Sequence, residues 1–226
     1  MGCGCLVYAF ITIRSMTHAE LFSYIKAKTD WNKVEKDKII AEYKIEKLDG
    51  KLAVLFQQSS EKTDWIKNLS YKQKKYKCSD GTVLHFHHGF YEYYDLMKDD
   101  IIGSLLDWLK HEPVESILVS GWSLGAGVSE IAVQDINYHT GLKCELINFG
   151  TPQAIYCEPT RAICAAACAT VFEYCNNNDI VTHMPPFLGW THINRIKVGT
   201  DTDPIKLLNP WKYHTNYNET VPALEV

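Results

Sequence analysis

Residues 121–125 have the sequence Gly-Trp-Ser-Leu-Gly, which fits the pattern G-x-S-x-G. The apolar run 116–120 before it predicts a buried strand, and the small residues after the serine begin a predicted helix. This strand–turn–helix setting is typical of a nucleophile elbow, a tight turn that lifts a serine hydroxyl clear of a sheet. Such a tight turn has no room for side chains beside the serine, and Gly121 and Gly125 have none. We predict that Ser123 is a nucleophile at a helix N-terminus, where developing negative charge is favoured. The alternative is a plain strand-to-helix turn.

A serine nucleophile needs a base, and the base needs a carboxylate that orients it. In this architecture the acid follows the serine in the chain, and the histidine follows the acid. Asp179 is the best-placed acid, because it lies in an Asn-rich loop after the apolar segment 170–174. Its alternative role is to cap a turn. Three histidines follow, His183, His192 and His214. The position after the last predicted strand favours His214 as the base and leaves the other two open.

The elements that must position these residues follow from the hydrophobic pattern. Helices are predicted at 17–28, 90–111 and 124–138, and strands at 38–47, 52–56, 116–120, 144–149, 170–174 and 193–198. The helix at 90–111 is expected to turn its apolar residues inward, namely Leu96, Ile101, Leu105, Leu106, Trp108 and Leu109. Strands that alternate with helices from residue 52 onward predict a mainly parallel sheet, and the turn at 48–51 adds an antiparallel hairpin. The fold class is therefore α/β.

Length and composition are those of one globular domain. The chain has 226 residues, 46% of them hydrophobic, and we expect a single domain over 1–226 with 1–14 as a candidate terminal extension. The net charge of -4 argues against nucleic acid as a partner. No apolar run reaches the roughly 18 residues that a membrane span needs. No positive charge precedes the short N-terminal apolar run, so a cytoplasmic location is slightly favoured over a secreted one. Cys3 and Cys5 are candidates for palmitoylation.

The chain contains eight cysteines but no C-x-x-C pair. It is too long for a disulfide scaffold, and the spacings of seven, four and seven between Cys157, Cys164, Cys168 and Cys175 fit no common zinc pattern. We therefore expect mostly free thiols, with disulfides as the alternative, and no metal site. Cys164 and Cys168 are expected on one face of a helix.

Several motifs together resemble the class 3 lipases, the family of the fungal triacylglycerol lipases and plant lipase-like acyl hydrolases. Residues 121–126 resemble the family's G-H-S-L-G-G/A elbow. The other similar segments occur in family order: 54–59 (A-F-R-G-[ST]), 64–69 (D-W-x-x-[ND]-L), 88–90 (H-x-G-[FL]), 149–152 (F-G-x-P), 178–186 (D-x-V-x-x-L-P-P), 188–192 (G-[FY]-x-H) and 214–217 (H-x-x-Y).

The resemblance implies an α/β-hydrolase fold, with helices on both faces of the sheet. It also implies a catalytic triad of Ser123, Asp179 and His214, since the family's base stands in H-x-x-Y. The family's G-[FY]-x-H histidine is not its base, which argues against His192. The implied oxyanion hole consists of the backbone N–H groups of Ser59 and Leu124.

The sequence departs from the family's pattern at several places, including a short span between Asp179 and His214. Gln57-Gln58 replaces Arg-Gly, which removes backbone freedom beside the oxyanion hole. Trp122 replaces the elbow histidine, at a position that catalysis is not expected to use. Segment 60–77, where the fungal lid lies, has six lysines against two acids and no strong apolar face. Interfacial activation is therefore not expected. The lysines are interpreted either as a surface for anionic interfaces or as a solvated loop.

The expected function is that of a serine carboxylic-ester hydrolase acting on lipid esters, in the manner of an acylglycerol lipase. The alternatives are a phospholipase A1 or an acyltransferase that uses the same site, and a catalytically degenerate member that binds lipid. The change at Gln57-Gln58 is the support for the degenerate alternative. The expected partner is a lipid ester, with a membrane or lipid-droplet surface as a further candidate. No cofactor is expected.

Overall fold

The computed structural model describes residues 15–37, 39–57, 72–78, 81–199, 210–222, 224 and 226. The candidate terminal extension 1–14, the predicted oxyanion residue Ser59 and the cysteines at positions 3 and 5 lie outside these residues. Gln58 and the larger part of segment 60–77 do so too.

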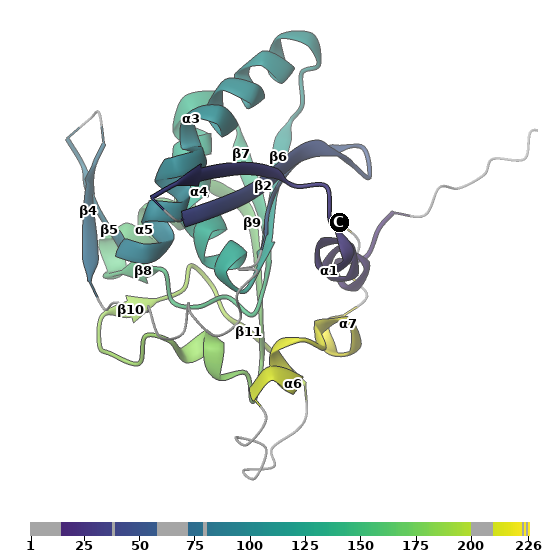
Figure 1. Cartoon of the computed structure of the whole chain (residues 1–226), viewed down its shortest axis with the longest axis vertical. Coiled ribbons are helices and arrows are strands. Elements are labelled where there is room, and N and C mark those ends of the chain that lie inside the picture. Colours follow the sequence, from purple (N-terminus) through teal and green to yellow (C-terminus); the bar gives the residue numbers. More distant parts are fainter. Residues whose placement is uncertain are drawn as a thin grey trace, which may run out of the picture.

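A seven-stranded sheet runs through the middle of the described chain (Figure 1). In spatial order its strands are β1 (Asn32–Lys36), β2 (Ile39–Leu48), β3 (Lys51–Phe56), β6 (Ser116–Trp122), β7 (Lys143–Phe149), β9 (Cys168–Asn176) and β11 (Ile196–Val198). The strands from β3 to β11 are parallel, whereas β1 and β2 are antiparallel to their neighbours. The predicted α/β-hydrolase fold with an antiparallel N-terminal hairpin is confirmed.

The sequence explains the centre of this sheet. β3 is buried along almost its whole length, as expected of an apolar run that has a strand on each side and helices above and below. The turn between β2 and β3 places Asp49 and Gly50 at positive φ, which the Asp-Gly pair tolerates well. The late strand is shorter than predicted, because β11 begins only at Ile196.

A second, four-stranded antiparallel sheet lies beside the first in the described chain. Its strands, in spatial order, are β10 (Trp190–Thr191), β8 (Ile155–Tyr156), β5 (Val83–His87) and β4 (Gln73–Lys77). The sequence does not predict this sheet, because β8 and β10 have two residues each and show no periodicity.

Helices cover both faces of the main sheet, as expected (Figure 1). One face carries α3 (His88–His111), α4 (Leu124–Thr140) and α5 (Glu158–Ala166). The other face carries α1 (His18–Ala27) and α7 (Tyr217–Thr220). Two short helices are also described, η1 (Ile180–His183) and α6 (Pro210–His214). None of the described helices has both the length and the apolar character to cross a membrane.

Two expectations about side chains were wrong. Leu106 is 39% exposed, because the buried stripe of α3 runs through Ile101, Ile102 and Leu105 and the next residue lies about 100° further round the helix. Cys168 does not share a helix with Cys164, since α5 ends at Ala166 and Cys168 begins β9.

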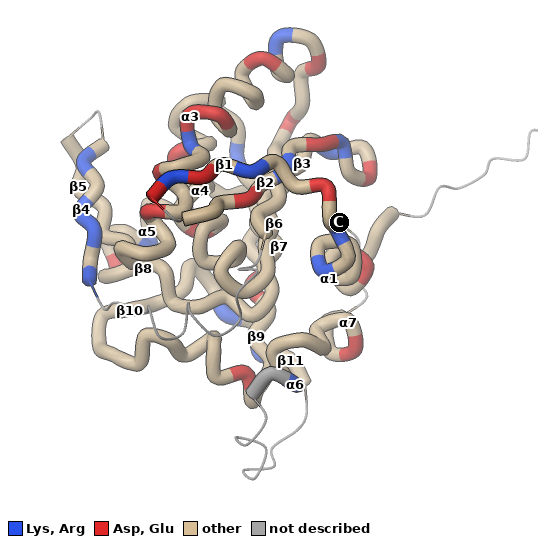
Figure 2. The backbone as a smooth tube through the Cα atoms, viewed as in Figure 1, with Lys and Arg blue, Asp and Glu red and all other residues tan. Residues whose placement is uncertain are grey.

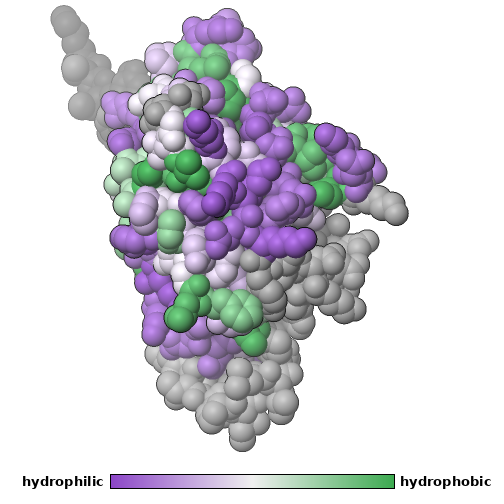
Figure 3. Space-filling model, turned by 90° about the vertical axis from the view of Figure 1, so that its left-hand side faces the viewer, coloured by the Kyte–Doolittle hydropathy of each residue, from purple (hydrophilic) through white to green (hydrophobic). Residues whose placement is uncertain are grey.

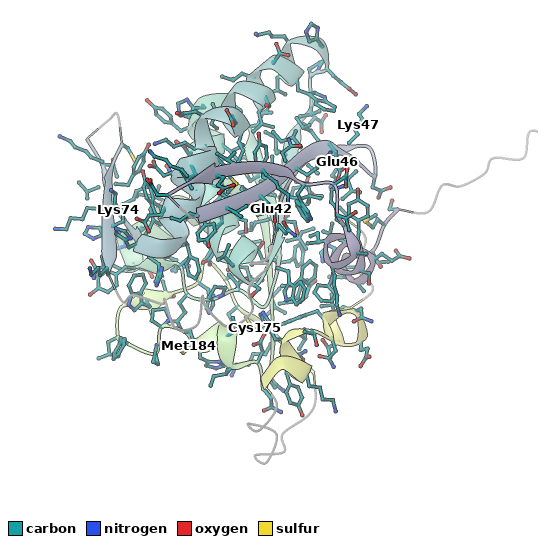
Figure 4. All side chains as sticks on the ribbon, viewed as in Figure 1. Glu42, Glu46, Lys47, Lys74, Cys175 and Met184 are labelled. Carbon is teal, nitrogen blue, oxygen red and sulfur yellow. The ribbon has the colours of Figure 1, made fainter. Side chains whose placement is uncertain are left out.

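The six cysteines of the described chain are free thiols. Cys175 lies in the interior of the molecule (Figure 4) and is fully buried. Burial raises the pKa of its thiol to about 12, so the thiolate needed for nucleophilic or redox chemistry is disfavoured.

Candidate active site

Ser123 forms the corner between β6 and α4. Its φ of 60° and ψ of -123° are unusual for a residue with a side chain, and the residue is buried. A Cβ atom on Gly121 would overlap the carbonyl group of Gly125, and one on Gly125 would overlap the carbonyl oxygen of Phe56. The corner therefore requires glycine at both positions. The tight, strained strand–turn–helix predicted from the sequence is present.

Asp179 and His214 meet at the carboxyl end of the sheet. Asp179 follows β9 and precedes η1, and His214 ends α6. Nδ1 of His214 lies 2.8 Å from Oδ2 of Asp179, and both residues are buried. The Val181 N–H donates to Oδ1 of Asp179 at 3.0 Å, which fixes the plane of the carboxylate.

Tyr217 determines how the protons are arranged in this group. Its hydroxyl accepts a hydrogen bond from the Asn176 N–H at 3.0 Å and lies 2.7 Å from Oδ2 of Asp179. The phenolic proton is therefore donated to the carboxylate, which acts as the acceptor. The histidine must then carry its proton on Nδ1, which leaves a lone pair on Nε2. This is the tautomer that a general base toward a serine hydroxyl requires.

The residues around Phe149 bring the elbow close to the histidine. The Ser123 N–H donates to the Phe149 carbonyl at 3.0 Å. A Cβ atom on Gly150 would lie 2.8 Å from Cε1 of His214 and 3.0 Å from Oδ2 of Asp179. The imidazole therefore occupies the space that a side chain at position 150 would need.

Trp122 contributes more than the sequence indicated. Its Nε1–H donates to the His214 carbonyl at 2.9 Å, and the two rings lie 5.6 Å apart. The side chain therefore holds the backbone of the candidate base, a positioning contact that the sequence does not reveal.

The other two candidate histidines lie elsewhere. Nδ1 of His183 is 3.2 Å from the backbone oxygen of Asp179, and its Nε2 faces Arg195. Burial and the Arg195 charge lower the pKa of His183. Nε2 of His192 donates to the Thr182 carbonyl at 2.9 Å. No hydrogen bond between either imidazole and the Asp179 carboxylate occurs among the described residues.

The candidate oxyanion hole is described in part. Leu124 is the first residue of α4, so its N–H has no partner within the helix and can donate to a ligand. The backbone of Phe56 and Gln57 lies against Gly125, which brings the end of β3 to the elbow. Ser59 and Gln58 are outside the described residues.

Sequence reasoning missed Asn148 of β7. Its Oδ1 accepts hydrogen bonds from the Gly121 N–H at 3.1 Å and from the Ser129 hydroxyl at 2.7 Å. Its amide nitrogen donates to the Ala126 carbonyl at 3.1 Å. Asn148 thus ties both sides of the elbow together. A polar residue in the otherwise apolar stretch from Leu146 to Phe149 was the signal available in the sequence.

Comparisons with known proteins agree with this architecture. Residues 53–189 match the family model described as Lipase (class 3). The chain is 26% identical over 155 residues to a lipase of Rhizomucor miehei, covering 67% of this chain and 42% of that protein. It is 22% identical over 151 residues to the secreted mono- and diacylglycerol lipase A of Penicillium cyclopium, covering 66% of this chain and 48% of that protein. The chain thus spans less than half the length of these curated relatives.

Solved structures show the same fold. The Rhizomucor miehei lipase–propeptide complex aligns with a TM-score of 0.64 at 20% identity, covering 83% of this chain and 68% of that one. A triacylglycerol lipase described as having a serine protease triad at its catalytic centre aligns with a TM-score of 0.63 at 20% identity, covering 75% and 64%.

Proposed function

Because this chain belongs to the class 3 lipase family, we propose that it is a serine hydrolase of lipid carboxylic esters, with Ser123, His214 and Asp179 as its catalytic triad. The observation that carries the proposal is the 2.8 Å contact between His214 and Asp179, next to a strained serine corner. The proton arrangement imposed by Tyr217 supports it, since it selects the His214 tautomer with a lone pair on Nε2, which a general base requires.

The mechanism transfers an acyl group in two steps. Ser123 Oγ attacks the ester carbonyl carbon while His214 Nε2 takes the hydroxyl proton, and Asp179 stabilises the imidazolium. The same proton then passes to the departing alcohol, which leaves an acyl-enzyme. Water, deprotonated by His214, attacks the acyl carbonyl carbon, and the bond to Ser123 Oγ breaks as the imidazolium returns the proton to that oxygen and the acid departs. The N–H groups of Leu124 and Ser59 stabilise the negative oxygen in both steps.

We infer that the substrate is an acylglycerol. The names of the relatives support this class, because they describe a lipase and a mono- and diacylglycerol lipase. A phospholipase A1 or an acyltransferase would use the same residues, and the two differ from a lipase in head group or acyl acceptor. The Penicillium relative is named as secreted, which leans against the cytoplasmic preference from the N-terminal sequence.

The second sheet supplies a surface suited to an anionic lipid interface. The lysines of β4 are exposed and form a basic edge (Figure 2), and Lys74 projects at the margin of the molecule (Figure 4). At the opposite edge, next to β10, Leu188 is 98% exposed. In the space-filling view of this side, hydrophilic residues dominate and hydrophobic ones form small separate patches (Figure 3). Such a surface suits reversible, charge-assisted contact more than deep insertion.

The experiment is hydrolysis of a p-nitrophenyl ester series from butyrate to palmitate, followed by mono-, di- and triacylglycerols and a phospholipid. Wild type is compared with Ser123→Ala and with Ser23→Ala, an exposed serine on α1 that serves as control. We expect turnover in wild type and Ser23→Ala and none in Ser123→Ala. The chain-length optimum and preferred glyceride then distinguish lipase, esterase and phospholipase. A folded wild type that hydrolyses no ester would refute the proposal and favour a lipid-binding protein.

A further inference from the structure

Three buried side chains that the proposed mechanism does not use lie together behind the elbow. Glu130 comes from α4, Glu173 from β9, and His192 follows β10. The two glutamates are 0% exposed and His192 is 6% exposed. One potential ligand atom from each residue lies within 4.8 Å of the other two.

The histidine directs a lone pair toward the carboxylates. Its Nε2–H donates to the Thr182 carbonyl at 2.9 Å, and a carbonyl oxygen can only accept, so Nδ1 carries no proton in the neutral ring. Nδ1 is 4.0 Å from Oε1 of Glu130 and has no hydrogen-bond partner within the described chain. A buried acceptor that faces other acceptors is unfavourable unless a cation or a proton lies between them.

Both carboxylates are held in place by donors. The Ile193 N–H donates to Oε1 of Glu130 at 2.9 Å, and the Asn194 N–H donates to Oε2 of Glu173 at 2.7 Å. The amide of Asn148 lies 3.4 Å from Oε1 of Glu173. The Ala154 N–H also donates to Oε2 of Glu130, at 3.3 Å. Each carboxylate has about four acceptor positions, so these bonds leave lone pairs for a further ligand.

The positive charge that two buried carboxylates need is not provided by an ion pair. Among the described residues, no lysine or arginine forms a salt bridge with Glu130 or Glu173. Unpaired buried charges cost several kcal/mol each, which makes a bound cation favourable here.

We propose that Glu130, Glu173 and His192 form a structural binding site for a divalent transition-metal ion, of which zinc is the type. Two carboxylate oxygens and one imidazole nitrogen are ligands that zinc accepts. A histidine ligand usually donates its other ring N–H to a carbonyl or carboxylate, as His192 does to Thr182. Tetrahedral ligand atoms at about 2.1 Å from zinc are roughly 3.4 Å apart. The three candidate ligand atoms lie within 4.8 Å of one another, so zinc binding would draw the side chains together by about 1 Å.

The site would stabilise the loop that carries the candidate acid. Its ligands join α4, β9 and the segment after β10. His192 bonds to Thr182, and the Thr182 hydroxyl donates to the Asp179 carbonyl at 2.9 Å. The ion therefore acts on the stability of the loop and takes no part in the chemistry at Ser123.

The test measures zinc directly in the full chain. Protein purified without chelator is analysed for bound metal by mass spectrometry, then stripped with a chelator and titrated with ZnCl2 while the unfolding temperature is recorded. We expect about one zinc per chain and a higher unfolding temperature with zinc. His192→Gln keeps an N–H group that can reach Thr182 but removes Nδ1, and we expect it to weaken zinc binding by at least about 10–100-fold. His139→Gln, an exposed change on α4, should bind zinc as wild type does.

Two results would overturn the proposal. One is a folded wild-type chain that holds no metal and whose unfolding temperature does not respond to Zn²⁺ or Mn²⁺. The other is a wild type whose stability does not change with zinc, together with a Glu130→Gln variant that is more stable than stripped wild type. That result would mean that a shared proton, and not a metal ion, holds the carboxyls of Glu130 and Glu173 together. Neither readout depends on ester hydrolysis, so failure here is distinct from failure of the proposed function.

Discussion

His214 and Asp179 lie 35 residues apart in the chain, yet Nδ1 of one is 2.8 Å from Oδ2 of the other. The same carboxylate oxygen accepts the hydroxyl of Tyr217 at 2.7 Å. Two donors on one oxygen hold the carboxylate as an acceptor and thereby select the tautomer of His214. In the proposed mechanism, Tyr217 is a positioning residue for the triad.

Replacing Tyr217 with phenylalanine tests this role. The change removes one donor to Asp179, so we expect kcat to fall by up to about tenfold with KM little changed, and stability to fall by about 1–3 kcal/mol. Asp179→Asn should cost far more, about 10⁴-fold in kcat. Tyr174→Phe is the matched control, because its buried hydroxyl bonds to His18 and not to Asp179. Equal kcat values for Tyr217→Phe and Tyr174→Phe in steady-state kinetics would contradict the positioning role of Tyr217.

Gly150 and Gly141 form a second matched pair. Both have positive φ, of 59° and 72°, but a Cβ atom at Gly150 would press on His214 whereas one at Gly141 would meet nothing within 4 Å. Either alanine should cost about 1–2 kcal/mol of stability through backbone strain. Only Gly150→Ala should displace the imidazole, with a loss of about 100-fold in kcat/KM. Equal activities of the two variants, measured on one soluble ester, would contradict this arrangement of the site.

His87 should make stability depend on pH. It is 1% exposed, and neither ring nitrogen has a hydrogen-bond partner in the described chain. Its ring contacts the rings of Phe90 and Trp190. Burial lowers its pKa from 6.5 to about 4. Between about pH 6.5 and pH 4, His87 binds a proton in the unfolded chain but not in the folded chain. The free energy of unfolding therefore falls as the pH drops through this range. Urea unfolding at pH 7, 6 and 5 should show that the free energy of unfolding falls less steeply with decreasing pH in His87→Phe than in wild type or His139→Gln. If the stability of His87→Phe fell with pH as steeply as that of wild type, His87 would be excluded as the cause of the pH dependence.

The basic edge of β4 should promote binding to anionic membranes. Each lysine near such a surface contributes about 1 kcal/mol. Lys74→Gln and Lys75→Gln in β4, combined with Lys72→Gln just before it, should therefore weaken binding to phosphatidylglycerol vesicles about 100-fold at low salt. The control removes the same charge from other exposed lysines, Lys33, Lys36 and Lys110. Vesicle sedimentation that shows equal losses for both sets would mean that net charge, and not this edge, governs binding.

The parts of the fold that sequence predicted are those encoded locally. The apolar runs gave β3, β6 and β7, and the two glycines around Ser123 matched a corner that admits no side chain at either position. The place of Asp179 is predictable because loops after parallel strands meet at one edge of a sheet. The structure places it there, beside His214.

The parts that sequence could not predict depend on contacts between distant segments. Glu130 and Glu173 each interrupt an apolar pattern, but nothing local shows that the two interruptions coincide in space. The sequence around Trp122 gives no sign that its indole N–H donates to the His214 carbonyl, 92 residues away. The two-residue strands β8 and β10 depend on such pairing, since β8 pairs with both β5 and β10.

Reaction with a fluorophosphonate tests the proposed triad most directly. The probe forms a stable bond only with a serine that a neighbouring base has activated. Intact-mass and peptide mass spectrometry should find one adduct per wild-type chain, located on Ser123. No adduct should form in Ser123→Ala, and labelling should be strongly slowed in His214→Gln. A folded wild type that stays unlabelled, or is labelled equally fast without His214, would contradict the triad.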